Sequence, residues 1–142
     1  MLALFDVNVL IALFDPAHVH HERAHRWWKL NKASGWASCP LTENGFVRIL
    51  SQPKYPNAIP THDALRRLSQ SINLGGHTFW VDDVSLTDTT VFHSEHMLRP
   101  KQITDLYLLA LAIRNSGRLV TFDRGIPLSG VEGAREKHRV VL

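Results

Sequence analysis

Short apolar runs alternate with longer stretches of mixed polarity along this chain, and the two kinds of segment predict different elements. The apolar runs have the length of buried strands and lie at residues 2–5, 35–39, 78–81 and 119–122, with an edge strand expected at 139–142. In the longer stretches, apolar positions recur at helical spacing, which predicts helices over residues 9–14, 18–30, 40–50, 61–73, 85–98 and 103–113. Strands that alternate with helices indicate an α/β fold, in which a central, mostly parallel sheet carries helices on both faces and residues 2–5 form the central strand.

The helix over residues 103–113 is apolar on both faces, which indicates that it is buried on every side. Thr104 is a suitable N-cap, which places Asp105 in the first turn, and Gly117 is expected to end the helix. An otherwise apolar helix therefore carries a single carboxylate, at its N-terminus. Hydroxyl side chains are also expected to cap the helices 61–73 and 85–98, through Thr61 and through Ser85 or Thr87.

Three further carboxylates lie where strands and helices meet. Asp6 follows the first strand, Asp123 follows the strand at 119–122, and Glu43 falls in the first turn of the helix 40–50. In a parallel sheet with right-handed connections, every strand ends and every following helix begins at the same edge. We therefore expect Asp6, Glu43, Asp105 and Asp123 to converge there. Each could instead serve only as a helix cap or as a favourable charge at a helix N-terminus, and Asn8 could cap the first helix in place of Asp6.

Four anions in one place need a counter-charge. At ~4 Å, each pair repels by on the order of 4 kcal/mol at an effective dielectric constant of about 20, so protons or a divalent cation must neutralise part of the charge. A ligand set of oxygens without His or Cys favours Mg²⁺ or Mn²⁺ over Zn²⁺. Two such ions ~3.5–4 Å apart would stabilise the attacking and leaving oxygens of phosphodiester hydrolysis.

Composition narrows the class of protein. The chain has 142 residues, which suits one domain, and a net charge of +3 with a pI of about 9.4. An acidic pocket on such a basic surface suits an enzyme that acts on a polyanion, although the charge alone supports nucleic acid only weakly. The single cysteine, Cys39, excludes a disulfide within the chain and suits a reducing cytoplasm. The first apolar residues lack a basic flank and end at Asp6, so we expect neither a signal peptide nor a membrane span.

Several histidines precede a pair of tryptophans in the predicted helix 18–30. His21 and His25 have the spacing of a zinc pair, but no cysteine or further ligand completes such a site. We therefore expect these histidines on a polar helix face. Trp27 and Trp28 are expected in the core or on a surface that a partner covers.

Around the carboxylates, the sequence resembles PIN-domain proteins and, more narrowly, the VapC-type toxins of bacterial toxin–antitoxin systems. The matching stretches follow the order of the family's motifs from end to end of the chain. They are Leu4-Phe5-Asp6-Val7-Asn8-Val9-Leu10, Thr42-Glu43-Asn44-Gly45-Phe46, Ile103-Thr104-Asp105 and Leu119-Val120-Thr121-Phe122-Asp123-Arg124-Gly125. One departure is Val7, because the first motif of the family often has a hydroxyl residue there.

The resemblance implies a three-layer PIN-like fold over residues 1–142 and the activity of a Mg²⁺-dependent ribonuclease, with Mn²⁺ as a substitute ion. Asp6, Glu43, Asp105 and Asp123 would form the catalytic acidic site. Asp6 and Asp105 would bind the metal directly, and the other two directly or through water. Polar flanking residues would orient these carboxylates; they are Asn8, Thr104 and Thr121. The implied partners are an RNA substrate, a small cognate antitoxin that blocks the acidic pocket, and a second copy of the chain in a homodimer.

Other interpretations stay open at this point. A binding or scaffold protein whose carboxylates are only helix caps would have no metal affinity. A phosphatase or phosphotransferase with Asp6 as nucleophile usually needs a second acid two residues later, where this chain has Asn8, and a lysine to hold the phosphate. A PIN-fold protein of RNA processing or DNA-linked regulation would share the acidic site, and only gene context would distinguish it from a toxin.

Overall fold

A computed structural model of residues 1–142 contains one five-stranded sheet in which all neighbouring strands are parallel, in the order β3-β2-β1-β4-β5. The strands are β1 (Ala3–Phe5), β2 (Trp36–Ser38), β3 (His77–Phe79), β4 (Arg118–Thr121) and β5 (Arg139–Val141). The sheet thus confirms the predicted parallel arrangement, with β1 at the centre and β5 at an edge.

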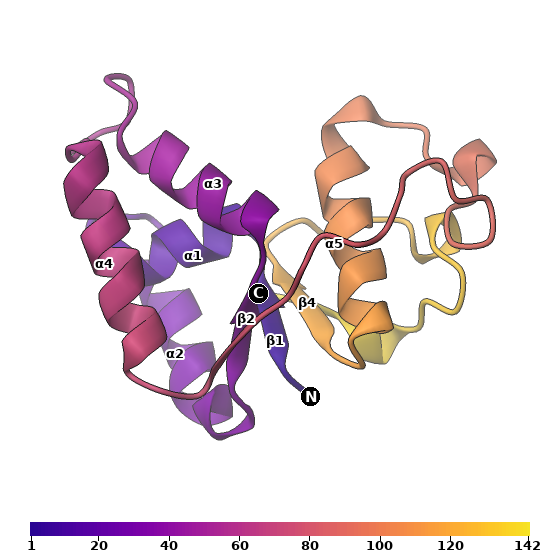
Figure 1. Cartoon of the computed structure of the whole chain (residues 1–142), viewed down its shortest axis with the longest axis horizontal. Coiled ribbons are helices and arrows are strands. Elements are labelled where there is room, and N and C mark those ends of the chain that lie inside the picture. The colour runs from indigo at the N-terminus through magenta and orange to yellow at the C-terminus, as the bar shows by residue number, and fades with distance from the viewer.

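Helices cover both faces of the sheet. They are α1 (Val7–Phe14), α2 (His21–Asn31), α3 (Pro40–Leu50), α4 (Thr61–Asn73) and α5 (Ile103–Arg114). Helices α1 to α4 form one layer, whereas α5 lies on the other side of the sheet together with the segment before it and the segment after β4 (Figure 1). No helix is both long enough and apolar enough to cross a lipid bilayer.

The central strand separates two hydrophobic clusters. Ala3 and Phe5 belong to the cluster beneath α1 to α4, and Leu4 belongs to the cluster around α5. Successive side chains of a strand point to opposite faces, so a strand covered on both sides is apolar throughout, which is what the run at residues 2–5 indicated. Helix α5 is buried along most of its length, as predicted from its two apolar faces.

Helix α1 crosses α3 at very short range. A Cβ atom on Gly45 of α3 would lie 2.6 Å from Cγ2 of Val7 in the first turn of α1. Only glycine therefore allows this approach, which brings the first turn of α1 against the middle of α3. The side chain of Val7 packs against α3 at this point.

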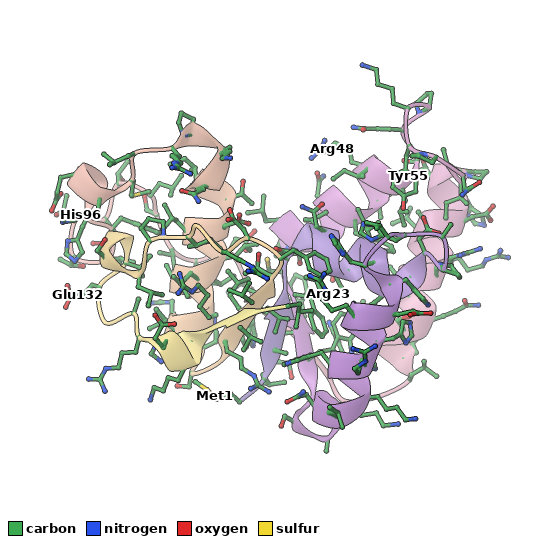
Figure 2. All side chains as sticks on the ribbon, turned by 180° about the vertical axis from the view of Figure 1, so that it is seen from behind. Met1, Arg23, Arg48, Tyr55, His96 and Glu132 are labelled. Carbon is green, nitrogen blue, oxygen red and sulfur yellow. The ribbon has the colours of Figure 1, made fainter.

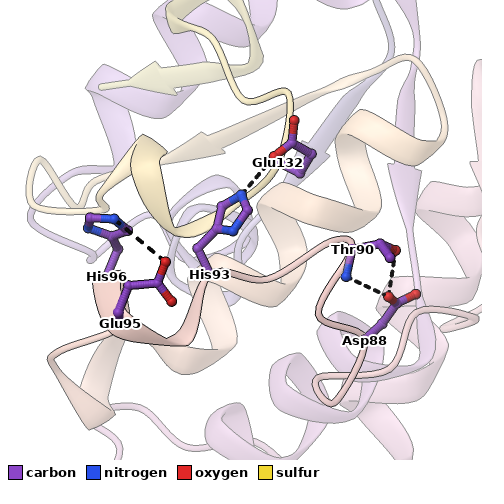
Figure 3. A network of polar contacts seen from close by, with 6 residues as sticks. All are labelled: Asp88, Thr90, His93, Glu95, His96 and Glu132. Atoms are coloured by element: carbon purple, nitrogen blue, oxygen red, sulfur yellow. Dashed lines mark hydrogen bonds and ion pairs between the residues drawn. The ribbon is translucent and has the colours of Figure 1, made fainter.

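The predicted helix over residues 85–98 is wrong. This segment consists of turns and a short 3₁₀ helix, Ser94–His96. The carboxylate of Asp88 accepts hydrogen bonds from the backbone N–H of Thr90 at 2.9 Å and from its hydroxyl at 2.6 Å (Figure 3). Such local bonds compete with those of a helix. The apolar residues that suggested a helix instead pack from these turns onto the α5 cluster; they include Val91, Phe92 and Met97.

Long-range contacts hold the same segment in place. Phe92 forms an antiparallel bridge with Val131, and the imidazole of His93 bonds the carboxylate of Glu132 at 2.7 Å (Figure 3). These partners lie in the chain after β4, about 40 residues away in sequence. A local pattern does not contain them, which is why spacing alone suggested a helix here.

Three predicted caps differ from the structure. Pro60 precedes α4 without a side-chain cap, so Thr61 is the first helical residue rather than the cap. Gln102 occupies the N-cap position of α5 in place of Thr104, because a 3₁₀ turn (Pro100–Gln102) runs directly into the helix. Helix α5 ends at Arg114, three residues before Gly117. A Cβ atom on Gly117 would lie 2.5 Å from the ring of Trp80, so this glycine allows a close contact.

Helix α2 begins at His21 rather than at residue 18, because residues 16–20 form turns. The imidazoles of His21 and His25 bond the backbone carbonyls of Ala12 and Leu13, at 2.7 Å and 2.8 Å. The two histidines therefore join α2 to the end of α1. Their spacing serves this contact and not a zinc ion.

Candidate functional site

Three aspartates meet at the edge of the sheet where the parallel strands end. Asp6 follows β1 and is the N-cap of α1, Asp105 lies in the first turn of α5, and Asp123 comes two residues after β4. The charge of Asp123 raises the pKa of Asp6, and the charges of Asp6 and Asp123 both raise the pKa of Asp105. The three carboxylates therefore lie within each other's electrostatic range, although they come from distant parts of the chain.

Asp6 is the most buried of the three, with 5% of its surface exposed. Its Oδ1 accepts the backbone N–H of Val9 at 2.8 Å, so Asp6 itself caps α1 and Asn8 does not. Burial raises the pKa of Asp6, while hydrogen bonds from the hydroxyl of Thr121 and from the start of α1 partly oppose that rise. Because burial dominates, a nearby cation would stabilise the charged form of Asp6.

Asp105 has a strongly raised pKa. Burial, followed by the charges of Asp6 and Asp123, raises the pKa of Asp105 from 3.8 to about 7. Without a cation, this carboxyl group is therefore about half protonated at pH 7. Its side chain makes no hydrogen bond within the chain, so its oxygens are available to a ligand.

A small cradle holds Asp123. Its Oδ1 accepts the backbone N–H of Gly125 at 2.7 Å, and its Oδ2 accepts the side-chain amide of Gln102 at 3.3 Å. A Cβ atom on Gly125 would lie 2.9 Å from the Gln102 amide nitrogen, so a larger residue there would displace the end of the Gln102 side chain. Gln102 is 3% exposed. The sequence did not indicate this role, because Gln102 lies outside the acidic motifs, in a short stretch with the basic residues Arg99 and Lys101.

Glu43 lies at the same edge of the sheet but belongs to a different network. The hydroxyl of Ser38, at the end of β2, donates to Oε1 of Glu43 at 2.6 Å and lies 2.8 Å from Nε2 of His77. A hydroxyl has one proton to donate, so Nε2 of His77 must donate its own proton to Ser38. Burial lowers the pKa of His77 and so favours this neutral form, although Glu43 partly opposes the shift.

The expected flanking residues contribute unequally. Thr121 is fully buried; its hydroxyl bonds the carboxylate of Asp6 and accepts the backbone N–H of Asp123 at 3.0 Å. Asn8 is exposed and contributes its backbone to the hydrogen bonding of Asp6, whereas Thr104 is exposed and makes no side-chain hydrogen bond. Among these three, Thr121 is the side chain that fixes the relative positions of two carboxylates.

The donor set fits a hard divalent cation. Its atoms are carboxylate oxygens, and the mutual repulsion that raises the pKa of Asp105 would be relieved by a positive ion. No three carboxylate, imidazole or thiol groups are already arranged around one point as ligands of an ion. Mg²⁺ commonly uses only one or two carboxylates and completes its coordination shell with water and substrate phosphate. Asp6 and Asp105 could supply these two carboxylates.

Comparison with known proteins identifies one family and several relatives within it. The profile of the PIN domain family matches residues 3–129. Ribonuclease VapC44 of Mycobacterium tuberculosis is 48% identical over 142 residues, which is 100% of both chains. From the same organism, Ribonuclease VapC38 is 48% identical over 126 residues, covering 88% of this chain and 87% of its own. Ribonuclease VapC39 is 44% identical over 137 residues, covering 96% of this chain and 99% of its own.

Proposed function

The chain belongs to the PIN domain family, as a VapC-type ribonuclease, and from this premise we propose that it hydrolyses RNA phosphodiester bonds with Mg²⁺ held at the acidic edge of the sheet. In this proposal, Asp6 and Asp105 bind the ion directly, and Mn²⁺ can replace it. Asp123 and Glu43 complete the site, directly or through water. Bound there, Mg²⁺ would neutralise the carboxylates, attract the phosphate and lower the pKa of a water molecule.

The residues of the chain would divide the remaining work. The cap on α1 and the hydroxyl of Thr121 hold Asp6 in one orientation, and Gln102 with Gly125 holds Asp123. Glu43 keeps one oxygen free of hydrogen bonds within the chain and can accept a proton from water through it. Because Ser38 fixes the other oxygen, the free one has a defined direction.

The observation that carries the proposal is the placement of Asp6, Asp105 and Asp123 at one edge of the sheet, where burial and the two neighbouring charges raise the pKa of Asp105 to about 7. A scaffold whose carboxylates were only helix caps would not need Asp105 beside two further anions, since it caps no helix by its side chain. Such an unfavourable arrangement is typical of a functional site. The phosphotransferase alternative gains no support, because the position two residues after Asp6 is the exposed Asn8.

Cleavage of RNA by the purified chain tests this proposal. Total bacterial RNA, incubated with the protein and Mg²⁺, should yield new 5′ ends at a restricted set of sites, and EDTA should prevent this. Asp105→Asn should abolish cleavage while keeping the fold. Asp63→Asn is the matched control, because Asp63 lies on α4 and pairs with Arg66 at the surface. Unchanged cleavage by Asp105→Asn would refute the assignment of the site.

As a VapC-type toxin, the protein should arrest growth when it is expressed without its partner. We propose that a small antitoxin encoded beside it blocks the acidic edge, and that two copies of the chain form a homodimer. An RNA substrate implies action in the cytoplasm, which suits the buried, unpaired Cys39. Growth arrest that the neighbouring gene relieves, and that Asp105→Asn abolishes, would support the toxin role over a role in RNA processing.

A further inference from the structure

Three aromatic rings gather beside the acidic edge without belonging to it. Phe122 extends from the end of β4, and the rings of His18 and His20 approach it from the turn between α1 and α2. The ring centroids of His20 and Phe122 are 4.7 Å apart, and those of His18 and Phe122 are 6.3 Å apart with nearly parallel planes, 14° from one another. All three side chains are half-buried.

This ring cluster lies next to two of the site carboxylates. Phe122 stands in the chain between Thr121, whose hydroxyl bonds Asp6, and Asp123. The backbone around Phe122 is fixed, because the N–H of Asp123 donates to the hydroxyl of Thr121. The ring cluster is therefore attached to the same short segment, Thr121 to Asp123, that contributes to the acidic edge.

Hydrogen bonding fixes the state of His18. Its Nδ1 accepts the backbone N–H of His20 at 3.0 Å, so the proton of the neutral ring is on Nε2. This Nε2–H has no partner within the chain. The imidazole of His20 makes no side-chain hydrogen bond at all. Phe122 also packs against the hydrophobic cluster beneath α1 to α4, and the half-buried rings present their remaining surface together with the free polar groups of the two histidines.

A cation adjoins the ring cluster. Arg23 follows His20 by about one helical turn and is exposed, with one guanidinium N–H bonded to the backbone oxygen of Leu142 at 3.1 Å. This bond holds Arg23 beside the end of β5, well apart from His96 and Glu132 (Figure 2). Its other N–H groups are available to a phosphate.

We propose that Phe122, His18 and His20 form a stacking platform for an unpaired base of the RNA substrate, and that Arg23 binds a phosphate of the same strand. The proposal rests on the function proposed above and specifies its substrate as RNA with a single-stranded base next to the scissile phosphate. Proteins recognise single-stranded RNA by stacking its bases on aromatic and imidazole rings and by pairing its backbone with cations. Paired bases within a duplex do not offer a free face for such stacking.

Fluorescence of 2-aminopurine tests the platform, because stacking quenches it. The probe is a short single-stranded oligouridine with one 2-aminopurine, mixed rapidly with the protein and Mg²⁺. The parent protein should quench the probe. His20→Ala and Phe122→Leu should lose the quenching and bind the oligonucleotide roughly 5- to 100-fold more weakly, whereas Phe122→Trp should keep both. Phe79→Leu is the control, since Phe79 is 50% exposed on the edge strand β3.

Two further measurements separate the possible failures. Mn²⁺ affinity should be the same in the parent, His20→Ala and Phe122→Leu, because none of the three rings is a metal ligand. If Mn²⁺ binding persists but the variants quench and bind like the parent, the platform is refuted and the nuclease proposal stands. If the parent neither binds Mn²⁺ nor cleaves RNA, the proposed function fails first.

A protein partner is the competing occupant of this surface. If His20→Ala weakens binding of the antitoxin while leaving the oligouridine probe unaffected, the ring cluster belongs to the protein interface and the proposal is overturned. Should Phe122→Leu unfold, His20→Ala still decides the question. Its imidazole makes no hydrogen bond that supports the fold.

Discussion

Replacing Asp105 by Asn should stabilise the metal-free protein at pH 8 and should not do so at pH 4. The carboxylate is half-buried beside Asp6 and Asp123, and its pKa is raised from 3.8 to about 7. Below about pH 4 it is protonated in both the folded and the unfolded chain. Between about pH 4 and pH 7 the folded chain keeps a proton that the unfolded chain has lost, so the free energy of unfolding falls as the pH rises. Above about pH 7 the whole cost of the charge is present.

The size of this effect follows from the same pKa. A rise from 3.8 to about 7 corresponds to about 4 kcal/mol, and solvent screening around a half-buried carboxylate reduces this to about 1–2 kcal/mol. Asn has nearly the same shape as Asp, and Asp105 makes no side-chain hydrogen bond that the substitution would break. The variant should therefore gain about 1–2 kcal/mol at pH 8, which is roughly 3–8 °C in melting temperature for a chain of this size.

Urea unfolding of both proteins, in EDTA and at a series of pH values, measures the difference. The stability gain of Asp105→Asn should grow between about pH 4 and pH 7 and then level off. A saturating divalent ion should reverse the order at pH 8, because it stabilises the parent by about 2.7 kcal/mol at a hundredfold excess over the dissociation constant and cannot use the amide equally well. A variant that is less stable than the parent at pH 8 in EDTA, or equally affected at all pH values, would refute the reasoning.

Substitutions at four further positions test how the site is positioned. Asp6→Asn should be more stable than Asp6→Ala by about 1 kcal/mol in thermal unfolding, because only Asn keeps the bond to the N–H of Val9; equal stabilities would mean that the cap is unimportant. Gly45→Ala should destabilise the fold by about 1–3 kcal/mol through its contact with Val7, and Val7→Ala should recover part of this in a double-mutant cycle. Gln102→Ala should slow RNA cleavage more than it changes Mn²⁺ affinity, whereas a loss of folding alone would make it a core residue.

Much of the fold follows from local pattern. The central strand at residues 2–5 is recognisable because a strand buried on both faces is apolar throughout, and α5 is recognisable because it has no polar face. The segment at 85–98 misleads for the opposite reason. Its apolar residues reach the core from turns, and the contacts that hold it, such as Phe92 with Val131, lie far away in the sequence.

The candidate site also has a part that the sequence predicts and a part that it does not. The rule that parallel strands end at one edge suffices to bring Asp6, Asp105 and Asp123 together. It also places Glu43 near that edge, but it does not indicate that Ser38 and His77 hold Glu43 in a separate network. Side-chain networks of this kind depend on rotamers and on neighbours from other segments, which no spacing along one chain describes.

The ring cluster illustrates the same limit. His18 and His20 were expected on a polar helix face, yet both lie in the turn before α2 and contact Phe122, which is more than a hundred residues away. The signal in the sequence was the number of histidines, and it suggested a metal site first. Their contact with Phe122 exists only once β4 and the turn between α1 and α2 meet in space.

Calorimetric titration of Mn²⁺ into the purified, antitoxin-free chain, beside Asp105→Asn, tests the central claim most directly. It does not depend on knowing the RNA target, and a nuclease with one narrow target looks inactive on the wrong RNA. We expect the parent to bind Mn²⁺ and Asp105→Asn to bind it much more weakly or not at all, with both proteins folded. If the folded parent binds no Mn²⁺, or if both proteins bind it equally, the carboxylates at the edge of the sheet are not the metal site of a nuclease.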